Sequence, residues 1–219
     1  MTRIKVCCIR DIGEAHTAIR LGATALGLVS EMPSGPGVIE EASIVSIASE
    51  VPSGTDTFLL TSLTDAGAIA AQHGRLATTT LQLVDQVGVS VLTELRDRLP
   101  SVRLVQVIHV RGPESLDEAI GVERHVDALL LDSGDPGLDV KKLGGTGRTH
   151  DWDVSRKIVE AVNVPVYLAG GLNSANVGDA MGAVRPYGLD LCSGVRTGGT
   201  LDPIKLAEFM ASVRAAGDW

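Results

Sequence analysis

Short apolar runs alternate with amphipathic stretches from one end of the chain to the other. Each run spans four to seven residues and is rich in Val, Leu and Ile. Apolar runs separated by helical patterns are typical of a parallel sheet with right-handed crossovers. We therefore expect eight strands, at Ile4–Ile9, Ala25–Val29, Thr57–Thr61, Thr80–Leu83, Arg103–His109, Ala128–Asp132, Val164–Ala169 and Leu189–Cys192.

The stretches between these runs repeat apolar residues at helical spacing. Eight strand–helix units in 219 residues fit a compact TIM barrel, so we predict one α/β domain, a (β/α)8 barrel over residues 1–219. A doubly wound open sheet is the alternative. The expected helices are Ile12–Leu21, Glu40–Glu50, Asp65–Gln72, Val89–Leu99, Pro113–Val122, Asp153–Ala161, Ala175–Val184 and Pro203–Ala215.

Two connections are longer than the usual two to six residues. They are Ser30–Val38, after the second expected strand, and Ser133–Thr149, after the sixth. In a barrel both lie at the carboxyl ends of the strands, where such enzymes place their active sites.

Composition and charge indicate how the core is built and which kinds of molecule the protein binds. Aromatic residues make up only 3% of the chain, so its core must consist mainly of aliphatic side chains, as in parallel sheets covered on both faces. The formal net charge of −8 argues against nucleic acid or an anionic membrane as the main partner. No apolar segment reaches the roughly 18 residues needed to span a bilayer, and we expect a cytoplasmic monomer or homodimer with a small-molecule ligand.

The three cysteines, Cys7, Cys8 and Cys192, contain no spaced CxxC pair. This pattern indicates neither a disulfide framework nor a zinc site, so we expect free thiols. Adjacent residues of a strand point to opposite faces, and the same is expected of Cys7 and Cys8.

A lysine and a cysteine share one face of the first expected strand. Alternation puts Lys5, Cys7 and Ile9 on that face and Cys8 on the other. A charged side chain is costly between strand and helix, so Lys5 and Cys7 should face the barrel interior. A nearby ammonium would favour the thiolate of Cys7, the form that acts as a base or nucleophile. The alternative is that Cys7 is a small core residue.

Two aspartates end or interrupt apolar strands. Asp132 closes the run ALLLD, where a carboxylate can serve as a general acid or base. It could instead cap the following loop or anchor Lys141 or Arg148. Asp190 lies earlier in its own strand, and there an ion pair with Lys5 is the favoured interpretation.

Three glycine clusters follow the sixth, seventh and eighth expected strands. They are Gly144–Thr149, Ala169–Gly171 and Ser193–Val195. Barrel enzymes frequently bind phosphate with the loops after strands seven and eight, where backbone N–H groups approach the ligand. The alternative is that these glycines only serve tight turns.

In order and spacing these residues resemble the phosphoribosylanthranilate isomerase family, a (β/α)8 barrel of tryptophan biosynthesis. The resemblance covers most of the chain and is most specific between Leu129 and Val195. Its matching pieces are IKVC, GATALGLV, LQLV, LLLD, GGTGRTHDW, LAGGLNSANV and VRPYGLDLCSGV.

The resemblance implies an Amadori rearrangement of a phosphorylated aminoaldose to an aminoketose, without metal or organic cofactor. By this analogy Asp132 is the general acid that protonates the furanose ring oxygen, and Cys7 is the general base that removes the C2 proton of the Schiff base. The ribose phosphate would be received by Gly145, Gly147, Gly170, Gly171, Ser193 and Gly194. The alternatives are an isomerase or lyase of another phosphorylated sugar and a non-catalytic protein that binds a phosphorylated ligand.

The chain also departs from the family pattern. Cys8 replaces the glycine of K-[IV]-C-G, and Gly37 occupies the place of the arginine that binds the anthranilate carboxylate. Arg10 and Arg196 are candidates to replace that arginine. The candidate substrate-binding residues are Lys5, Arg10, Gln82, Arg148 and Arg196.

Overall fold

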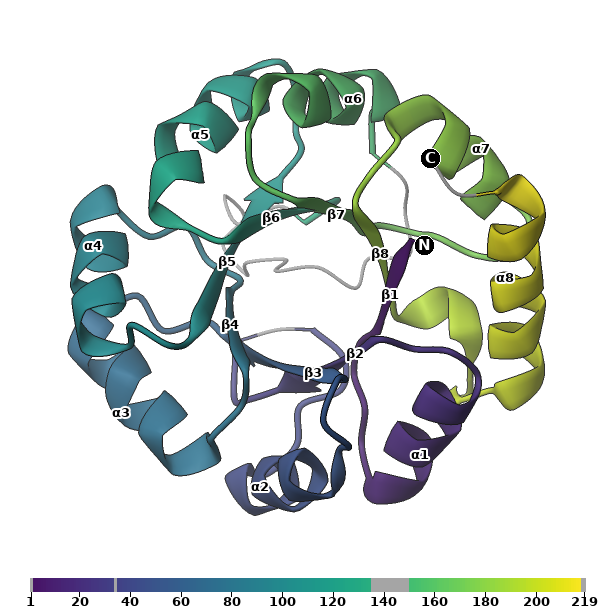
Figure 1. The fold of residues 1–219 in the computed structure, drawn as a ribbon, viewed down its shortest axis with the longest axis horizontal. Coiled ribbons are helices and arrows are strands. Elements are labelled where there is room, and N and C mark those ends of the chain that lie inside the picture. The colour runs from purple at the N-terminus through teal and green to yellow at the C-terminus, as the bar shows by residue number, and fades with distance from the viewer. Residues whose placement is uncertain (1, 34, 135–149, 218–219) are drawn as a thin grey trace.

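The computed structural model describes residues 2–33, 35–134 and 150–217. In this part of the chain eight parallel strands close into a barrel in sequence order, as Figure 1 shows in a view along the barrel. The predicted (β/α)8 barrel is confirmed, and the open sheet is wrong. The strands are β1 (Arg3–Val6), β2 (Ala25–Val29), β3 (Asp56–Thr61), β4 (Thr80–Leu83), β5 (Arg103–His109), β6 (Ala128–Asp132), β7 (Val166–Leu168) and β8 (Gly188–Leu191).

The helices form a ring around the barrel (Figure 1). They are α1 (Ile12–Arg20), α2 (Glu41–Glu50), α3 (Ala66–Leu76), α4 (Val89–Arg98), α5 (Glu114–Val122), α6 (Trp152–Ala161), α7 (Val177–Val184) and α8 (Pro203–Ala216). Two short 3-10 helices, η1 (Glu123–His125) and η2 (Ser193–Val195), and a hairpin of β9 (Arg196–Thr197) with β10 (Thr200–Leu201) complete the described structure.

Helix α3 is longer than the sequence predicts. It continues through Gly74 to Leu76, whose side chain is buried, and ends at Ala77 in the left-handed conformation (φ 51°). The buried leucine favours one more turn of helix over a stop at Gln72, and this outweighs the low helix propensity of glycine.

Aspartates begin four of the helices. The side chains of Asp11, Asp65, Asp151 and Asp202 each accept a hydrogen bond from a backbone N–H in the first turn of α1, α3, α6 and α8. Such caps satisfy N–H groups that have no partner within the helix. They fix helix starts at the end of the barrel where the strands finish.

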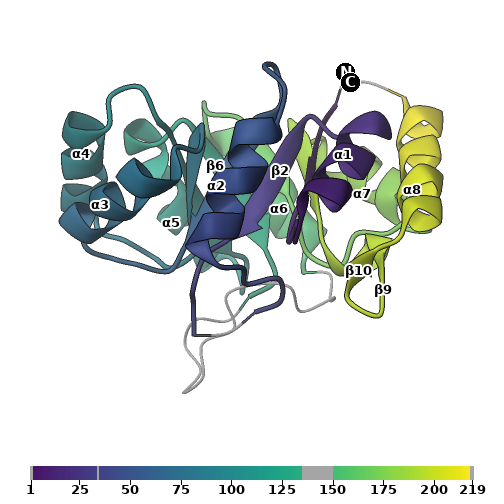
Figure 2. The same ribbon diagram turned by 90° about the horizontal axis from the view of Figure 1, so that it is seen from below.

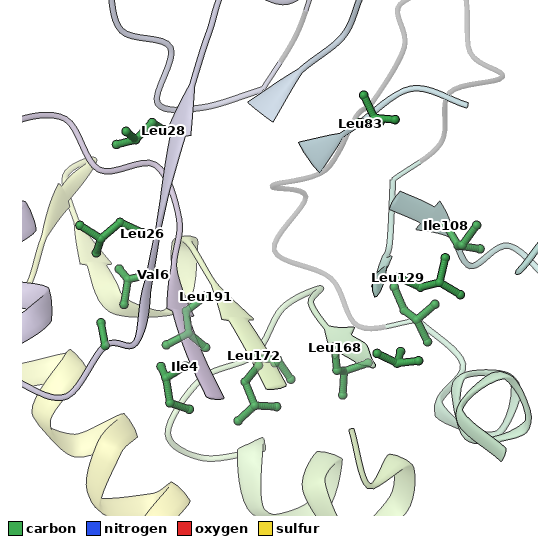
Figure 3. Packing of buried hydrophobic residues seen from close by; sticks show 14 of the residues in the cluster. Ile4, Val6, Leu26, Leu28, Leu83, Ile108, Leu129, Leu168, Leu172 and Leu191 are labelled. Atoms are coloured by element: carbon green, nitrogen blue, oxygen red, sulfur yellow. The ribbon is translucent and has the colours of Figure 1, made fainter. Parts of the chain in front are cut away.

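The core has two layers. Figure 3 shows aliphatic side chains such as Leu26, Leu28 and Leu129, which pack between strands and helices. A second cluster fills the barrel interior and includes Phe58 and Tyr167, whose rings meet edge to face at 5.9 Å between centroids. Burial on both faces explains why the strands read as continuous apolar runs.

The predicted alternation fails just beyond β1. The strand ends at Val6, and Cys8 adopts a left-handed backbone conformation with φ 62°. Because of this turn, the side chains of Cys8 and Ile9 point to the faces opposite to those that strand alternation predicts. Cys8 joins Cys7 in the interior cluster, and Ile9 packs in the outer layer. The expectation that Cys7 and Cys8 point to opposite faces is therefore wrong.

The carboxyl ends of the strands form one face of the molecule. In Figure 2 the described part of the loop after β2 and the β9–β10 hairpin lie at the bottom, on the side where the strands end. The loop after β2 returns to the barrel through a bridge between Val29 and Val38. Within the described residues, no helix combines the length and apolar character that crossing a membrane requires.

Candidate active site

A cavity opens at the carboxyl end of the barrel. Its empty space, including the part open to solvent, is about 640 Å³. Residues that follow or end β1, β6, β7 and β8 line it, among them Cys7, Asp132, Gly170, Gly171 and Ser193. The structure thus brings together the candidate acid, the candidate base and two of the three candidate phosphate loops.

A buried ion pair lies at the wall of the cavity, to which it contributes Asp190. Nζ of Lys5 is 2.9 Å from Oδ2 of Asp190 and 5.3 Å from the centroid of the Phe58 ring, and the Lys5 side chain is 0% exposed. Burial opposes the charge, but Asp190 and the nearby thiols outweigh it and raise the pKa of Lys5. The predicted ion pair is confirmed. Lys5 remains an ammonium ion that supports Asp190 and Cys7, and it does not line the cavity.

The thiol of Cys7 lies beside this ammonium. A hydrogen bond from Cys8 lowers the pKa of Cys7; burial opposes this effect and the charge of Lys5 adds to it. Its backbone N–H donates to the Leu191 carbonyl at 2.7 Å, which ties the residue to β8. A buried thiol with a lowered pKa that faces a cavity is suited to act as a base.

The carboxylate of Asp132 faces the same cavity from the end of β6. Its Oδ1 accepts a hydrogen bond from the Ser133 N–H at 2.7 Å. Its neighbour His150 was not among the residues predicted for the site. Burial lowers the pKa of His150, although the charges of Asp132 and Asp151 act in the opposite direction. Nε2 of His150 lies 2.7 Å from Oγ of Ser155. Its place in the motif GGTGRTHDW was the signal available.

Two glycine loops form the side of the cavity at β7 and β8. Gly170 and Gly171 have φ angles of 84° and 62°, values that favour glycine. Gly194 lies in η2, and a Cβ there would overlap the Leu172 carbonyl, so only glycine lets the two loops touch. The other predicted phosphate residues, Gly145 and Gly147, lie outside the described residues, as does Arg148.

Gln82 projects into the cavity from β4, across the barrel from the glycine loops. Its side chain is buried, and Oε1 has no hydrogen-bond partner among the described residues. A buried amide oxygen without a partner is costly, so a ligand that donates to it would be favoured.

Comparison with known proteins identifies the family. Residues 68–212 match the family model described as N-(5'phosphoribosyl)anthranilate (PRA) isomerase. The chain is 37% identical to N-(5'-phosphoribosyl)anthranilate isomerase 2 of Methanosarcina mazei, over 95% of this chain and 92% of that protein. It is 34% identical to the corresponding isomerase of Methanothrix thermoacetophila, over 98% and 99% of the two chains. The chain belongs to the phosphoribosylanthranilate isomerase family.

Solved structures show the same fold. The phosphoribosylanthranilate isomerase of Thermotoga maritima superposes with a TM-score of 0.84 at 23% identity, over 98% of this chain and all of that one. A phosphoribosylanthranilate isomerase in complex with reduced 1-(o-carboxyphenylamino)-1-deoxyribulose 5-phosphate superposes with a TM-score of 0.82 at 21% identity, with coverage of 98% and 100%.

Neither arginine suggested as a replacement for the family arginine lines the cavity. The Arg196 guanidinium contacts the Glu14 carboxylate at 3.1 Å and donates to the carbonyls of Cys7 and Cys8, and its side chain is 7% exposed. Arg10 is exposed and borders a separate depression between α1 and α2. Arg196 thus holds the chain after β1, and the structure does not bring it to the cavity.

The two substitutions in the family motifs adjoin each other. Gly37 has φ 82°, and a Cβ there would overlap Cβ of Cys8 and lie 2.9 Å from its Cα. Sγ of Cys8 lies 3.4 Å from the carbonyl oxygen of Pro36. The side chain at position 8 therefore fills the space that a side chain at position 37 would need, and the cysteine and the glycine accommodate each other.

Proposed function

We propose that this protein isomerises N-(5'-phosphoribosyl)anthranilate by an Amadori rearrangement, with Asp132 as general acid and Cys7 as general base. The observation that carries this proposal is that both side chains line one cavity in a barrel of this isomerase family. The same proposal makes the protein a cytoplasmic enzyme of tryptophan biosynthesis with a small phosphorylated substrate.

The two groups have separate tasks. Protonation of the furanose oxygen by Asp132 breaks the bond between that oxygen and C1 and gives an open-chain Schiff base. The Cys7 thiolate then removes the proton from C2, and the resulting enolamine tautomerises to the aminoketose. The hydrogen bond from Cys8 and the charge of Lys5 support this role because both favour the thiolate.

The phosphate belongs at the β7 and β8 side of the cavity in this proposal. Gly170, Gly171, Ser193 and Gly194 would present backbone N–H groups there, and residues 144–149 would complete the site. Glycine permits close approach of the backbone to a phosphate, and the positive φ angles of Gly170 and Gly171 agree with such loops.

The aromatic ring belongs on the opposite side of the cavity. Val29, Met32, Pro36 and Leu60 supply apolar surface there, and Gln82 supplies a polar group. The amide of Gln82 is our candidate to bind the polar substituent of the ring or the linking amine.

Complementation tests the proposal. A tryptophan auxotroph that lacks this isomerase should grow without tryptophan when it expresses the wild-type chain. It should not grow with Cys7→Ala or Asp132→Asn at equal protein level. The proposal would be contradicted if the wild-type chain did not restore growth without tryptophan, or if both variants restored it.

A second candidate is an isomerase of a different phosphorylated aminoaldose. The observation in its favour is the charge of the cavity lining. Among the described residues that line the cavity none is a lysine or arginine, and two, Asp132 and Asp190, are acidic. A screen of phosphorylated aminoaldoses with neutral substituents would support this candidate if one of them were turned over faster than phosphoribosylanthranilate. Faster turnover of phosphoribosylanthranilate than of all of them would remove it.

A further inference from the structure

Three thiols converge where β1 and β8 meet. Closure of the barrel pairs Val6 with Leu191, so Cys7 and Cys8 emerge beside Cys192 although they lie more than 180 residues apart in sequence. The backbone turns at both places, with φ 62° at Cys8 and an irregular conformation (φ −134°, ψ −88°) at Cys192. As a result Sγ of Cys192 lies 2.9 Å from Sγ of Cys8.

This separation is shorter than an ordinary contact between unbonded sulfur atoms. A disulfide requires about 2.05 Å, so the two atoms need to approach by less than about 1 Å. Both residues line the cavity, and Cys192 is partly exposed, so a small oxidant in solvent can reach it. All three thiols are free in the structure.

We propose that Cys8 and Cys192 form a redox-active thiol pair, which a peroxide converts to a disulfide between the segments that follow β1 and β8. The sulfur of Cys192 attacks one peroxide oxygen and the O–O bond breaks, giving a sulfenic acid; the released hydroxide takes the thiol proton and leaves as water. The sulfur of Cys8 then attacks the sulfenic sulfur and the S–O bond breaks. The second hydroxide leaves with the Cys8 proton as water. The thiols together lose two electrons and two protons, and hydrogen peroxide becomes two waters.

Geometry favours this pair over Cys7 and Cys8. Adjacent Cα atoms across a trans peptide are about 3.8 Å apart, below the 4.4–6.8 Å usual for a disulfide. The chain contains no cis peptide among the described residues. Cys7 also lies beside Lys5, and it is Sγ of Cys8 that contacts Sγ of Cys192.

The disulfide would act on the reaction through Cys7. In the reduced protein the thiol of Cys8 donates to Cys7 and lowers its pKa. Oxidation removes that donor, so the thiolate of Cys7 becomes less populated at a given pH. The disulfide itself does not depend on the proposed function, but this loss of activity rests on it.

The test is oxidation of the reduced full-length protein by a small excess of hydrogen peroxide. We expect the number of titratable thiols in the denatured protein to fall from three to one, with a mass decrease of about two hydrogens. Tandem mass spectrometry should join Cys8, in the tryptic peptide Val6–Arg10, to Cys192, in the peptide that ends at Arg196. Dithiothreitol should reverse all these changes.

Cys192→Ser and Cys8→Ser are the matched controls, with thermal unfolding to show that each is folded. Neither should form the cross-link. The proposal is wrong if wild type keeps three thiols, if the link involves Cys7 or a second chain, or if Cys192→Ser loses two hydrogens as wild type does. Because the readout is mass, failure of the proposed isomerase activity would not change this result.

Discussion

The thiol of Cys7 owes its character to its immediate neighbours. Lys5 is buried and paired with Asp190, and Cys8 donates a hydrogen bond from the adjacent position. The sequence made Lys5 and its partner predictable, because a buried ammonium requires a carboxylate. It did not make the contribution of Cys8 predictable, because that depends on a left-handed backbone conformation which few residues other than glycine adopt.

Replacing the ammonium should move the titration of Cys7. In Lys5→Met we expect the pKa of Cys7 to rise, so that the thiolate is lost at a higher pH as the solution is acidified. The ultraviolet absorbance of the thiolate as a function of pH measures this shift. Because Asp190 would be left unpaired, Lys5→Met with Asp190→Asn is the control for stability. An unchanged titration in both proteins would contradict the role of Lys5.

Gly37 and Cys8 should be energetically coupled. We expect Gly37→Ala to lower the free energy of unfolding by about 1–3 kcal/mol, because its Cβ would overlap Cys8 and its φ of 82° disfavours any side chain. In the Cys8→Gly background, Gly37→Ala should lower the free energy of unfolding by less. We expect the difference between the two backgrounds to be on the order of 1 kcal/mol. Urea unfolding of the four proteins measures the coupling, and equal costs in both backgrounds would refute it.

At the level of elements, hydrophobic periodicity located every strand and helix of the barrel. The errors lie at ends, where local signals conflict with packing. Alternation breaks at Cys8 because β1 has already ended, and α3 passes through Gly74 because Leu76 has a buried site to fill. The glycine loops were visible in the sequence, but their contact through Gly194 depends on tertiary structure.

The extended α3 leads to a stability prediction. A Cβ at Gly74 would meet nothing within 4 Å, and the residue is helical, so Gly74→Ala should raise the free energy of unfolding by about 0.5–1 kcal/mol. Gly121→Ala in α5 is a matched control, since its Cβ would also be unobstructed. Urea unfolding measures the change in the free energy of unfolding for both variants. If Gly74→Ala destabilised the protein while Gly121→Ala did not, the helix would not continue through this position as described.

At the scale of the whole molecule, closure of the barrel assembles the candidate site. It places β1 beside β8, which joins Lys5 to Asp190 and Cys8 to Cys192, and it brings Asp132 from β6 to the same cavity. The fold could be predicted from the periodicity of apolar residues, and the family from the order of the motifs. The position of Arg196 could not, because its partner Glu14 lies in a helix, and strand pairing does not fix that contact as it fixes Lys5 beside Asp190.

The most direct test of the central claim is the steady-state turnover of freshly prepared phosphoribosylanthranilate, followed by the loss of anthranilate-type fluorescence. We predict that the wild-type chain and Gly74→Ala turn the substrate over at similar rates. Cys7→Ala and Asp132→Asn should each lower kcat by at least about 100-fold, the usual contribution of a general acid or base, while remaining folded by circular dichroism. Turnover that survives both substitutions within a few-fold of wild type would contradict the assignment of Cys7 and Asp132 as base and acid.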